Sequence, residues 1–191
     1  MPKSDTIRSF IAVELDKTLQ AGLHQIQEHL QTCHPDVKWV KPDDIHLTLK
    51  FLGDVPVTTI QTIIKQLPSF VAGIRPFELI LNTVGAFPRI KQPRVIWAGV
   101  PEGQAHPILQ LAEAIEKGAR DLGFEKENKT FTAHVTMGRV RSTKNIKPLA
   151  EMLAQCEIPD TLTQTVQSVS LLKSTLKPQG PVYEVLSTTM L

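Results

Sequence analysis

The chain has 191 residues, of which 41% are hydrophobic and 21% charged, and its formal net charge is +2. This length is typical of a single domain, which buries enough surface to fold without disulfides or metals. A dedicated nucleic-acid binder usually carries a marked basic stripe. The charge therefore permits a polyanionic partner but does not argue for one.

The cysteines and the N-terminal segment indicate a cellular location. Cys33 and Cys156 form neither a disulfide framework nor a metal-type cysteine pair, which fits a reducing compartment. The opening segment MPKSDTIRSFIAVEL holds only a short apolar run that Glu14 interrupts, so we expect no signal peptide. No stretch approaches the length of a membrane span. We expect a cytoplasmic protein.

The first half of the chain alternates strand-like and helical patterns. Residues 7–15 are apolar and partly β-branched, which predicts a buried strand. Asp16 can cap a following helix whose apolar residues recur at helical spacing, at Leu19, Leu23, Ile26 and Leu30. We further expect an extended segment from 39, a turn at 42–44, a strand at 45–52, and a helix after Pro56 that ends at Pro68.

The second half continues in the same way. We expect strands at 77–84 and 94–100 joined by the loop GAFPRIKQP, then a helix at 107–122, a strand at 131–140 and a helix at 148–154. Two final strands, at 166–174 and 182–189, should flank a turn at 177–181. Strands with interspersed helices predict an α+β fold with mostly antiparallel sheets.

One internal echo stands out in this pattern. HLTLKFLGDV at 46–55 resembles HVTMGRVRST at 134–143, and each copy lies in a predicted strand that is followed, after a turn, by a helix. A duplicated half is therefore plausible, although a tetrapeptide echo alone is weak support.

Each copy presents an imidazole and a hydroxyl on one side of its strand. Residues i and i+2 of a strand share a face, so His46 lies beside Thr48 and His134 beside Thr136. Two such units around one phosphate suit a phosphodiester reaction: a neutral histidine takes a proton from water and a protonated one gives a proton to the leaving oxygen. The threonine hydroxyls can bind the phosphoryl oxygens. This chemistry needs neither a metal nor a covalent nucleophile.

Two other interpretations of the histidines stay open at this point. A single His-x-Thr in a strand is common by chance and is usually structural, and the pair of copies makes the structural and functional interpretations about equal. Zinc binding is a further alternative, but a catalytic zinc usually has three protein ligands. The remaining histidines, at 24, 29, 34 and 106, show no spacing that would supply a third.

The paired motifs, HLTL and HVTM, resemble the signature of the two-histidine phosphoesterase superfamily. Their surroundings resemble its RNA 2′,3′-cyclic phosphodiesterase branch, also called the 2′-5′ RNA ligase-like family. The similar segments are RSFIAVEL, WVKPDDIHLTLKFLGDV, PRVIWAGV, FTAHVTMGRV and GPVYEVLS. They run from about Arg8 to about Leu186, nearly the whole chain.

This resemblance implies a bilobal α+β fold with two mostly antiparallel sheets, pseudo-twofold symmetry, helices on the outer faces and a central cleft. Residues 1–191 would form a single domain of two intertwined lobes. The implied activity is hydrolysis of an RNA-terminal 2′,3′-cyclic phosphate to a 2′-phosphate, with weak, reversible 2′-5′ ligation as the back-reaction. Partners would be such RNA ends or small cyclic nucleotides, with no cofactor, no membrane and no obligatory protein partner.

The resemblance also implies roles for individual residues. His46 would donate a proton to the leaving 3′ oxygen, His134 would accept one from water, and Thr48 and Thr136 would hold the phosphate. The chain departs from the family at Ala133, where proline is frequent, and at Met137, where leucine is common. Neither change removes a functional group.

Further residues are weighed as candidates. By strand alternation Arg139 points away from the cleft unless the strand bulges at Gly138, so phosphate contact and a surface ion pair are equal alternatives. Phe87 can stack on a nucleobase or anchor its loop. Lys50 is in phase with His46 and can face the cleft edge, although a solvated lysine is favoured. Tyr183 can reach the site from the closing strand, although packing is favoured.

Three rival functions remain. The first is hydrolysis of another small cyclic phosphate, and the second is a module that only binds nucleotides or RNA ends. The third is ATP-driven ligation, which needs a phosphate-binding loop. The chain has no G-x-x-x-x-G-K-[ST] motif, which argues against ligation of this kind as the main activity.

Overall fold

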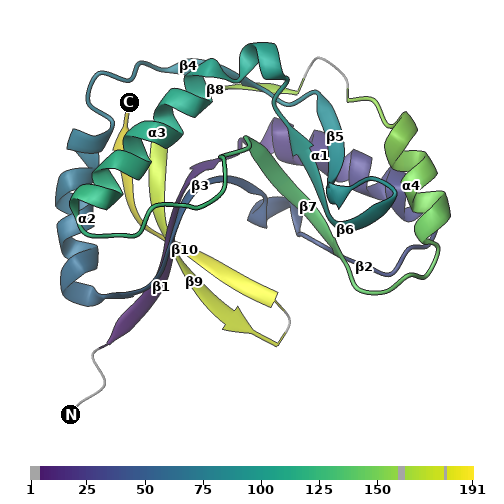
Figure 1. The fold of residues 1–191 in the computed structure, drawn as a ribbon, viewed down its shortest axis with the longest axis horizontal. Coiled ribbons are helices and arrows are strands. Elements are labelled where there is room, and N and C mark those ends of the chain that lie inside the picture. The colour runs from purple at the N-terminus through teal and green to yellow at the C-terminus, as the bar shows by residue number, and fades with distance from the viewer. Residues whose placement is uncertain (1–4, 159–161, 179) are drawn as a thin grey trace.

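The structure is a computed structural model that describes residues 5–158, 162–178 and 180–191. Two four-stranded antiparallel sheets face each other across a concave centre (Figure 1). The first sheet has the order β10-β9-β1-β3 and the second β2-β7-β6-β5, while β4 and β8 pair separately. Every strand pair in the described ranges is antiparallel. The predicted α+β fold is confirmed.

The elements follow one another in a repeating order. The first part contains β1 (Thr6–Glu14), α1 (Lys17–Gln31), β2 (Val37–Trp39), a short 3-10 turn (Pro42–Asp44), β3 (His46–Pro56) and α2 (Val57–Phe70). The middle contains β4 (Phe77–Ile80), β5 (Thr83–Arg89), β6 (Gln92–Gly99), a 3-10 turn (Glu102–Gln104), α3 (His106–Asp121), β7 (His134–Val140) and α4 (Ile146–Gln155). The chain then ends with β8 (Thr163–Val166), β9 (Ser168–Lys177) and β10 (Gly180–Met190).

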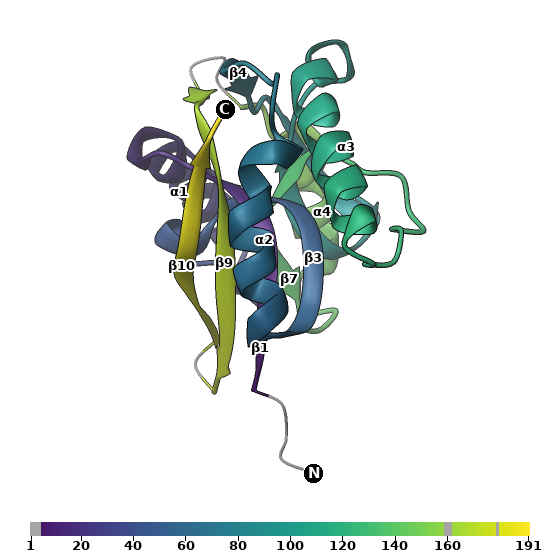
Figure 2. The same cartoon turned by 90° about the vertical axis from the view of Figure 1, so that its left-hand side faces the viewer.

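Each sheet is covered in part by a helix that follows a strand of the other sheet. α1 follows β1 of the first sheet but packs beside α4, which covers the second sheet. In the same way α3 follows β6 of the second sheet but packs against β3 and α2 of the first. Figure 2 shows α2 across the outer face of the first sheet with α3 beside it. Each half thus contains a strand, a crossing helix, a motif strand and a covering helix.

The helices form where the sequence predicts them because their apolar residues share one face. In α1 the side chain of Asp16 accepts a hydrogen bond of 2.8 Å from the Leu19 amide, which caps the helix. The predicted stripe of Leu19, Leu23, Ile26 and Leu30 is buried. It packs into the main hydrophobic core, which lies between the sheets and their covering helices.

Several predicted boundaries are wrong. The predicted loop GAFPRIKQP is a continuous hairpin of β5 and β6, and the strand expected at 77–84 is divided between β4 and β5. The strand expected from 131 begins at His134, and that expected at 166–174 is divided between β8 and β9. Of the turn expected at 177–181, Gln179 lies outside the described residues, while Lys177 ends β9 and Gly180 begins β10.

Helix α2 also continues past Pro68, where we expect it to end. Pro68 lies inside the helix, which runs on to Phe70. A proline removes only one backbone donor, and packing can compensate for that loss near a helix end. The Phe70 ring lies directly over Gly118 of α3, where a β-carbon would come within 2.2 Å of it. Tertiary contact therefore holds the last turn of α2.

Candidate active site

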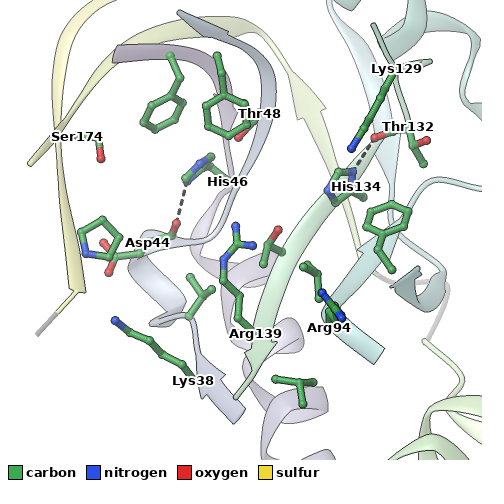
Figure 3. A pocket seen from close by; sticks show the side chains of 18 of the residues that line it. Lys38, Asp44, His46, Thr48, Arg94, Lys129, Thr132, His134, Arg139 and Ser174 are labelled. Atoms are coloured by element: carbon green, nitrogen blue, oxygen red, sulfur yellow. Dashed lines mark hydrogen bonds between the residues drawn. The ribbon is translucent and has the colours of Figure 1, made fainter. Parts of the chain in front are cut away.

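The concave centre of the molecule is a cleft lined by both sheets. Its volume is about 2580 Å³, well above the roughly 300–1,000 Å³ of ordinary small-molecule pockets. His46 and Thr48 at the start of β3 line it from the first sheet, and His134 and Thr136 at the start of β7 line it from the second. Figure 3 shows the two histidines on facing strands. The four side chains predicted from the motifs therefore share one cleft.

The two imidazoles are anchored in the same way. Nδ1 of His46 lies 2.8 Å from the carbonyl oxygen of Asp44, and Nδ1 of His134 lies 2.7 Å from that of Thr132. A carbonyl oxygen can only accept, so Nδ1 carries the hydrogen in both rings. Nε2 is then the nitrogen left to exchange protons. Each strand thus fixes its own histidine through the residue two positions earlier.

Aromatic rings pack against both imidazoles. Tyr183 of β10 meets the His46 ring edge-on at a centroid distance of 5.0 Å, and Phe87 of β5 meets the His134 ring edge-on at 5.1 Å. Phe10 of β1 also stacks on His46 at 4.8 Å. The expectation that Tyr183 packs is confirmed, although it packs inside the cleft. These rings restrict both imidazoles to one orientation.

Burial and nearby charges set the protonation of the two histidines. Burial lowers the pKa of His46, while the carbonyl of Asp44 and the carboxylates of Asp44 and Glu14 act in the opposite direction. Burial also lowers the pKa of His134, opposed by the carbonyl of Thr132. Here the nearby charge is the Arg139 guanidinium, which lowers the pKa further. The charges near His46 therefore favour its imidazolium form, whereas the charge near His134 favours the neutral form.

Both motif strands bulge at the fourth motif position. In β3, Thr48 pairs with Ala12 and Lys50 with Ile11, which leaves Leu49 as an extra residue. In β7, Thr136 pairs with Trp97 and Gly138 with Ile96, which leaves Met137 as an extra residue. An extra residue reverses the alternation of side chains beyond it. The residues that follow therefore face opposite to what alternation alone predicts.

Arg139 is turned into the cleft by the second bulge. It lines the cleft, and its guanidinium points into the space between the two histidines (Figure 3). A β-carbon at the neighbouring Gly138 would point away from the cleft and would lie 2.7 Å from Cγ1 of Val37. The bulge lies at Met137 rather than at Gly138. It still turns Arg139 into the cleft, which is the orientation that contact with a phosphate requires.

Lys50 is turned away from the cleft by the first bulge, so the expectation that it is solvated is wrong. Its side chain is 3% exposed, and its Nζ lies 2.8 Å from Oε2 of Glu116 and 3.9 Å from Oε1 of Glu127. It also donates a 2.8 Å hydrogen bond to the carbonyl of Glu125. Lys50 thus ties β3 to α3 and to the segment that leads to His134.

Gln27 has the same position in α1 that Glu116 has in α3. Gln27 is 1% exposed, and its amide donates 2.8 Å hydrogen bonds to the carbonyls of Val40 and Met137. Met137 is the bulged residue of β7, so α1 secures that bulge across the lobe boundary. Sequence periodicity did not single out Gln27, because it lies beside the apolar stripe of α1.

Basic residues gather along the cleft. Its lining includes Arg8, Lys38, Lys41, Lys91, Arg94, Lys126, Lys129, Arg139, Arg141, Lys147 and Lys177, but only Asp44, Glu113, Glu116 and Glu127 among the acidic residues. These are eleven of the 21 basic side chains and four of the 19 acidic ones in the chain. The net charge of the whole chain is small, but the lining of the cleft is strongly positive, which suits a polyanionic ligand.

The described part of the chain holds no group of three or more His, Cys, Asp and Glu side chains arranged to bind a metal ion. None of the helices in the described ranges combines the length and apolar character that a membrane crossing requires.

Comparison with known proteins identifies the family. A model of the LigT-like phosphoesterase family matches the chain over residues 13–97 and again over 99–183, and each match contains one His-x-Thr motif. The chain belongs to this family. It is a phosphoesterase, as the paired motifs predict, and the resemblance drawn from the sequence is confirmed.

Individual members of the LigT-like family support this assignment. The RNA 2′,3′-cyclic phosphodiesterase of Methanothermobacter thermautotrophicus is 33% identical over 177 residues, which cover 93% of this chain and 95% of that protein. The protein of the same name from Aquifex aeolicus is 32% identical and covers 94% of each chain. The crystal structure of TT0787 from Thermus thermophilus is 29% identical, with a TM-score of 0.78 over 97% of this chain and 98% of that one.

Proposed function

We propose that this LigT-like phosphoesterase opens the 2′,3′-cyclic phosphate at an RNA end and leaves a 2′-phosphate. The observation that carries the proposal is the matched anchoring of two histidines in one cleft, which leaves Nε2 of each ring free. The names of the two relatives described above support the choice of substrate. The site draws one half from each sheet, so we propose that the whole chain acts as one domain of two intertwined lobes.

The reaction needs two proton transfers. Nε2 of neutral His134 takes a proton from water, and the water oxygen bonds to phosphorus. The bond from phosphorus to the 3′ oxygen breaks on the opposite side, and protonated His46 gives its proton to that oxygen. Each transfer can contribute about 10²–10⁴ in rate. The products are a 2′-phosphate and a 3′-hydroxyl, with the two histidines in exchanged protonation states until solvent resets them.

The assignment of acid and base rests on the charges around each ring. Asp44 and Glu14 favour the imidazolium form of His46, which suits the proton donor. Arg139 favours the neutral form of His134, which suits the proton acceptor. Opposite local charge is how one pair of identical side chains is given two different tasks.

The remaining predicted site residues have a place in this scheme. Thr48 and Thr136 can donate hydroxyl hydrogen bonds to the phosphoryl oxygens, and Arg139 can neutralise their charge. Burial raises the pKa of Tyr183, which therefore keeps its hydroxyl hydrogen and can donate beside His46. Phe87 packs edge-on against His134, and its use as a stacking surface for a nucleobase stays a prediction.

The same site can use a second nucleophile. A 5′-hydroxyl in the place of water would lose its proton to His134 and bond to phosphorus. The bond from phosphorus to the 3′ oxygen would break, His46 would give that oxygen a proton, and a 2′-5′ linkage would form. We propose weak ligation of this kind as a secondary activity. A cytoplasmic site of action, the use of small cyclic nucleotides and the lack of an obligatory protein partner stay predictions from the sequence.

The test is product analysis on a short RNA that ends in a 2′,3′-cyclic phosphate. We expect wild-type protein to yield only the 2′-phosphate, with a bell-shaped pH dependence of kcat/KM, and to do so in EDTA as well. His46→Ala and His134→Ala should each lose most of this activity while unfolding as cooperatively as wild type. A 3′-phosphate product, or full activity in either variant, would contradict the proposal.

A further inference from the structure

The two histidines differ in how aromatic rings meet them. Phe10 of β1 lies nearly parallel to the His46 ring, with an interplanar angle of 28° and a centroid distance of 4.8 Å. Phe87 and Trp97 meet the His134 ring at 87° and 65°, with centroid distances of 5.1 and 6.3 Å. A ring face therefore covers His46, whereas neither Phe87 nor Trp97 lies parallel to His134.

The short side chain of Ala12 lets Phe10 and His46 meet. Phe10, Ala12 and Glu14 alternate with core residues along β1 and so share the cleft face of this strand. The backbone of Glu14 pairs with that of His46, so Phe10 lies at the far end of this row from the histidine. Because Ala12 has only a methyl group, the two rings can lean over it and stack.

Tyr183 packs against the side of this stack. Its ring stands at 79° to Phe10 with a centroid distance of 5.3 Å, and at 87° to His46 with a centroid distance of 5.0 Å. Phe10 itself is 2% exposed and packs with Ala12 and Leu172. Phe10 is thus held in place by its neighbours, and it excludes water from the face of His46 that it covers.

A stacked benzene ring acts on the charged imidazole more than on the neutral one. The face of the ring carries partial negative charge and attracts a cation that lies within about 6 Å of its centre. The neutral imidazole gains the packing but not this attraction. Since Phe10 excludes water from the contact, the attraction is stronger than at an exposed site.

Other groups act on the same equilibrium. The charged and titratable groups around His46 and Tyr183 are Glu14 and Arg8 of β1, Asp44 before β3, Arg139 of β7 and Tyr183 itself. The carboxylates of Glu14 and Asp44 favour the imidazolium, while burial opposes it. Burial also raises the pKa of Tyr183, which therefore stays uncharged. The face of Phe10 adds an uncharged contribution that works with the two carboxylates.

We propose that Phe10 is a positioning residue whose ring face stabilises the charged form of His46. The consequence for the reaction rests on the proposed function, in which protonated His46 gives its proton to the leaving 3′ oxygen. His134 receives no parallel ring face from Phe87 or Trp97, which suits its task as the neutral proton acceptor.

The first test weakens the ring face but keeps its packing. Phenylalanine with one, two or three fluorine atoms replaces Phe10, because fluorine withdraws charge from the ring face and adds little volume. Imidazole titration by NMR should show that the pKa of His46 falls with each added fluorine, while the pKa of His134 stays in place as the internal reference. An unchanged pKa of His46 across the series, or an equal fall for both histidines, would overturn the inference.

The second test measures the consequence for catalysis on an RNA that ends in a 2′,3′-cyclic phosphate. Phe10→Leu should lower kcat/KM by about five- to thirty-fold on the alkaline limb of the pH profile, where the rate depends on the charged fraction of His46. The acid limb depends on His134 and should stay unchanged. Phe77→Leu, in the main core, is the matched control and should keep the wild-type ratio of the two limbs. Equal losses on both limbs in Phe10→Leu would show a merely structural role and overturn this one.

Failure of the proposed function gives a different result. Wild-type protein that does not hydrolyse the cyclic RNA end would overturn the proposed function. The NMR titration of the fluorinated series requires no turnover, so it decides separately whether Phe10 acts on the charge of His46.

Discussion

The buried ammonium group of Lys50 lies 2.8 Å from a carboxylate oxygen of Glu116. The pair joins the strand of the first histidine to the helix that precedes the second. Gln27 of α1 makes the reciprocal connection to β7. Gln27 and Glu116 are each the eleventh residue of their helix, so the two crossing helices use equivalent positions to secure the two motif strands.

Replacing Lys50 should therefore destabilise the fold more than replacing a surface lysine. Lys50→Met leaves the partly buried Glu116 carboxylate without its cation, and we expect a loss of about 3 kcal/mol in the free energy of unfolding. Lys117→Met is the control, because Lys117 follows Glu116 on α3. Its pair with Asp121 is exposed at both ends, and such pairs contribute only about 0–1 kcal/mol. Urea unfolding of both variants measures the difference, and equal effects would contradict this role for Lys50.

Arg139 should act on the protonation of His134 and not on that of His46. Its guanidinium lowers the pKa of His134, so Arg139→Met should raise that pKa, although burial keeps it below the ordinary value. The pKa of His46 has other causes and should stay in place. Arg94→Met removes a different cation from the cleft lining and serves as the control. Imidazole titration by NMR gives each pKa separately, and an unmoved His134 would show that Arg139 lies elsewhere in solution.

Both motif histidines should also make stability depend on pH. Their pKa values are lowered in the folded protein, so the unfolded chain binds protons more readily. The free energy of unfolding should then be unaffected by these groups above the ordinary histidine pKa of about 6.5, and should fall as the pH drops below it. Replacing both with asparagine should flatten this part of the curve. Denaturant unfolding between about pH 5 and 7.5 tests this, and parallel curves for the two proteins would refute it.

The sequence predicts the local features of this fold well. Helix α1 follows from Asp16 and a stripe of leucines, because capping and helical spacing are properties of neighbouring residues. The same holds for the shared face of His46 and Thr48, which strand alternation determines. The boundaries are harder to predict, since contacts distant in sequence decide them. Phe70, for example, holds α2 together beyond Pro68 by packing on Gly118.

The rest of the site depends on two bulges and on distant strands. Alternation gave the wrong direction for Lys50, because one extra residue at Leu49 reverses the directions of Lys50 and Phe51. Comparing the two motif copies could have indicated the bulges, since Lys50 and Gly138 occupy the same position in each. Tyr183 and the basic residues of the cleft come from many separate segments. Only the assembled sheets bring them together.

We propose that His46 protonates the leaving 3′ oxygen while His134 activates water at the same phosphorus. A cyclic substrate with sulfur in place of the 3′ oxygen tests it most directly, because a thiolate leaves without needing a proton. We predict that His46→Ala recovers most of the wild-type rate on this substrate, while His134→Ala stays inactive. Recovery in His134→Ala instead, or in neither variant, would contradict the account.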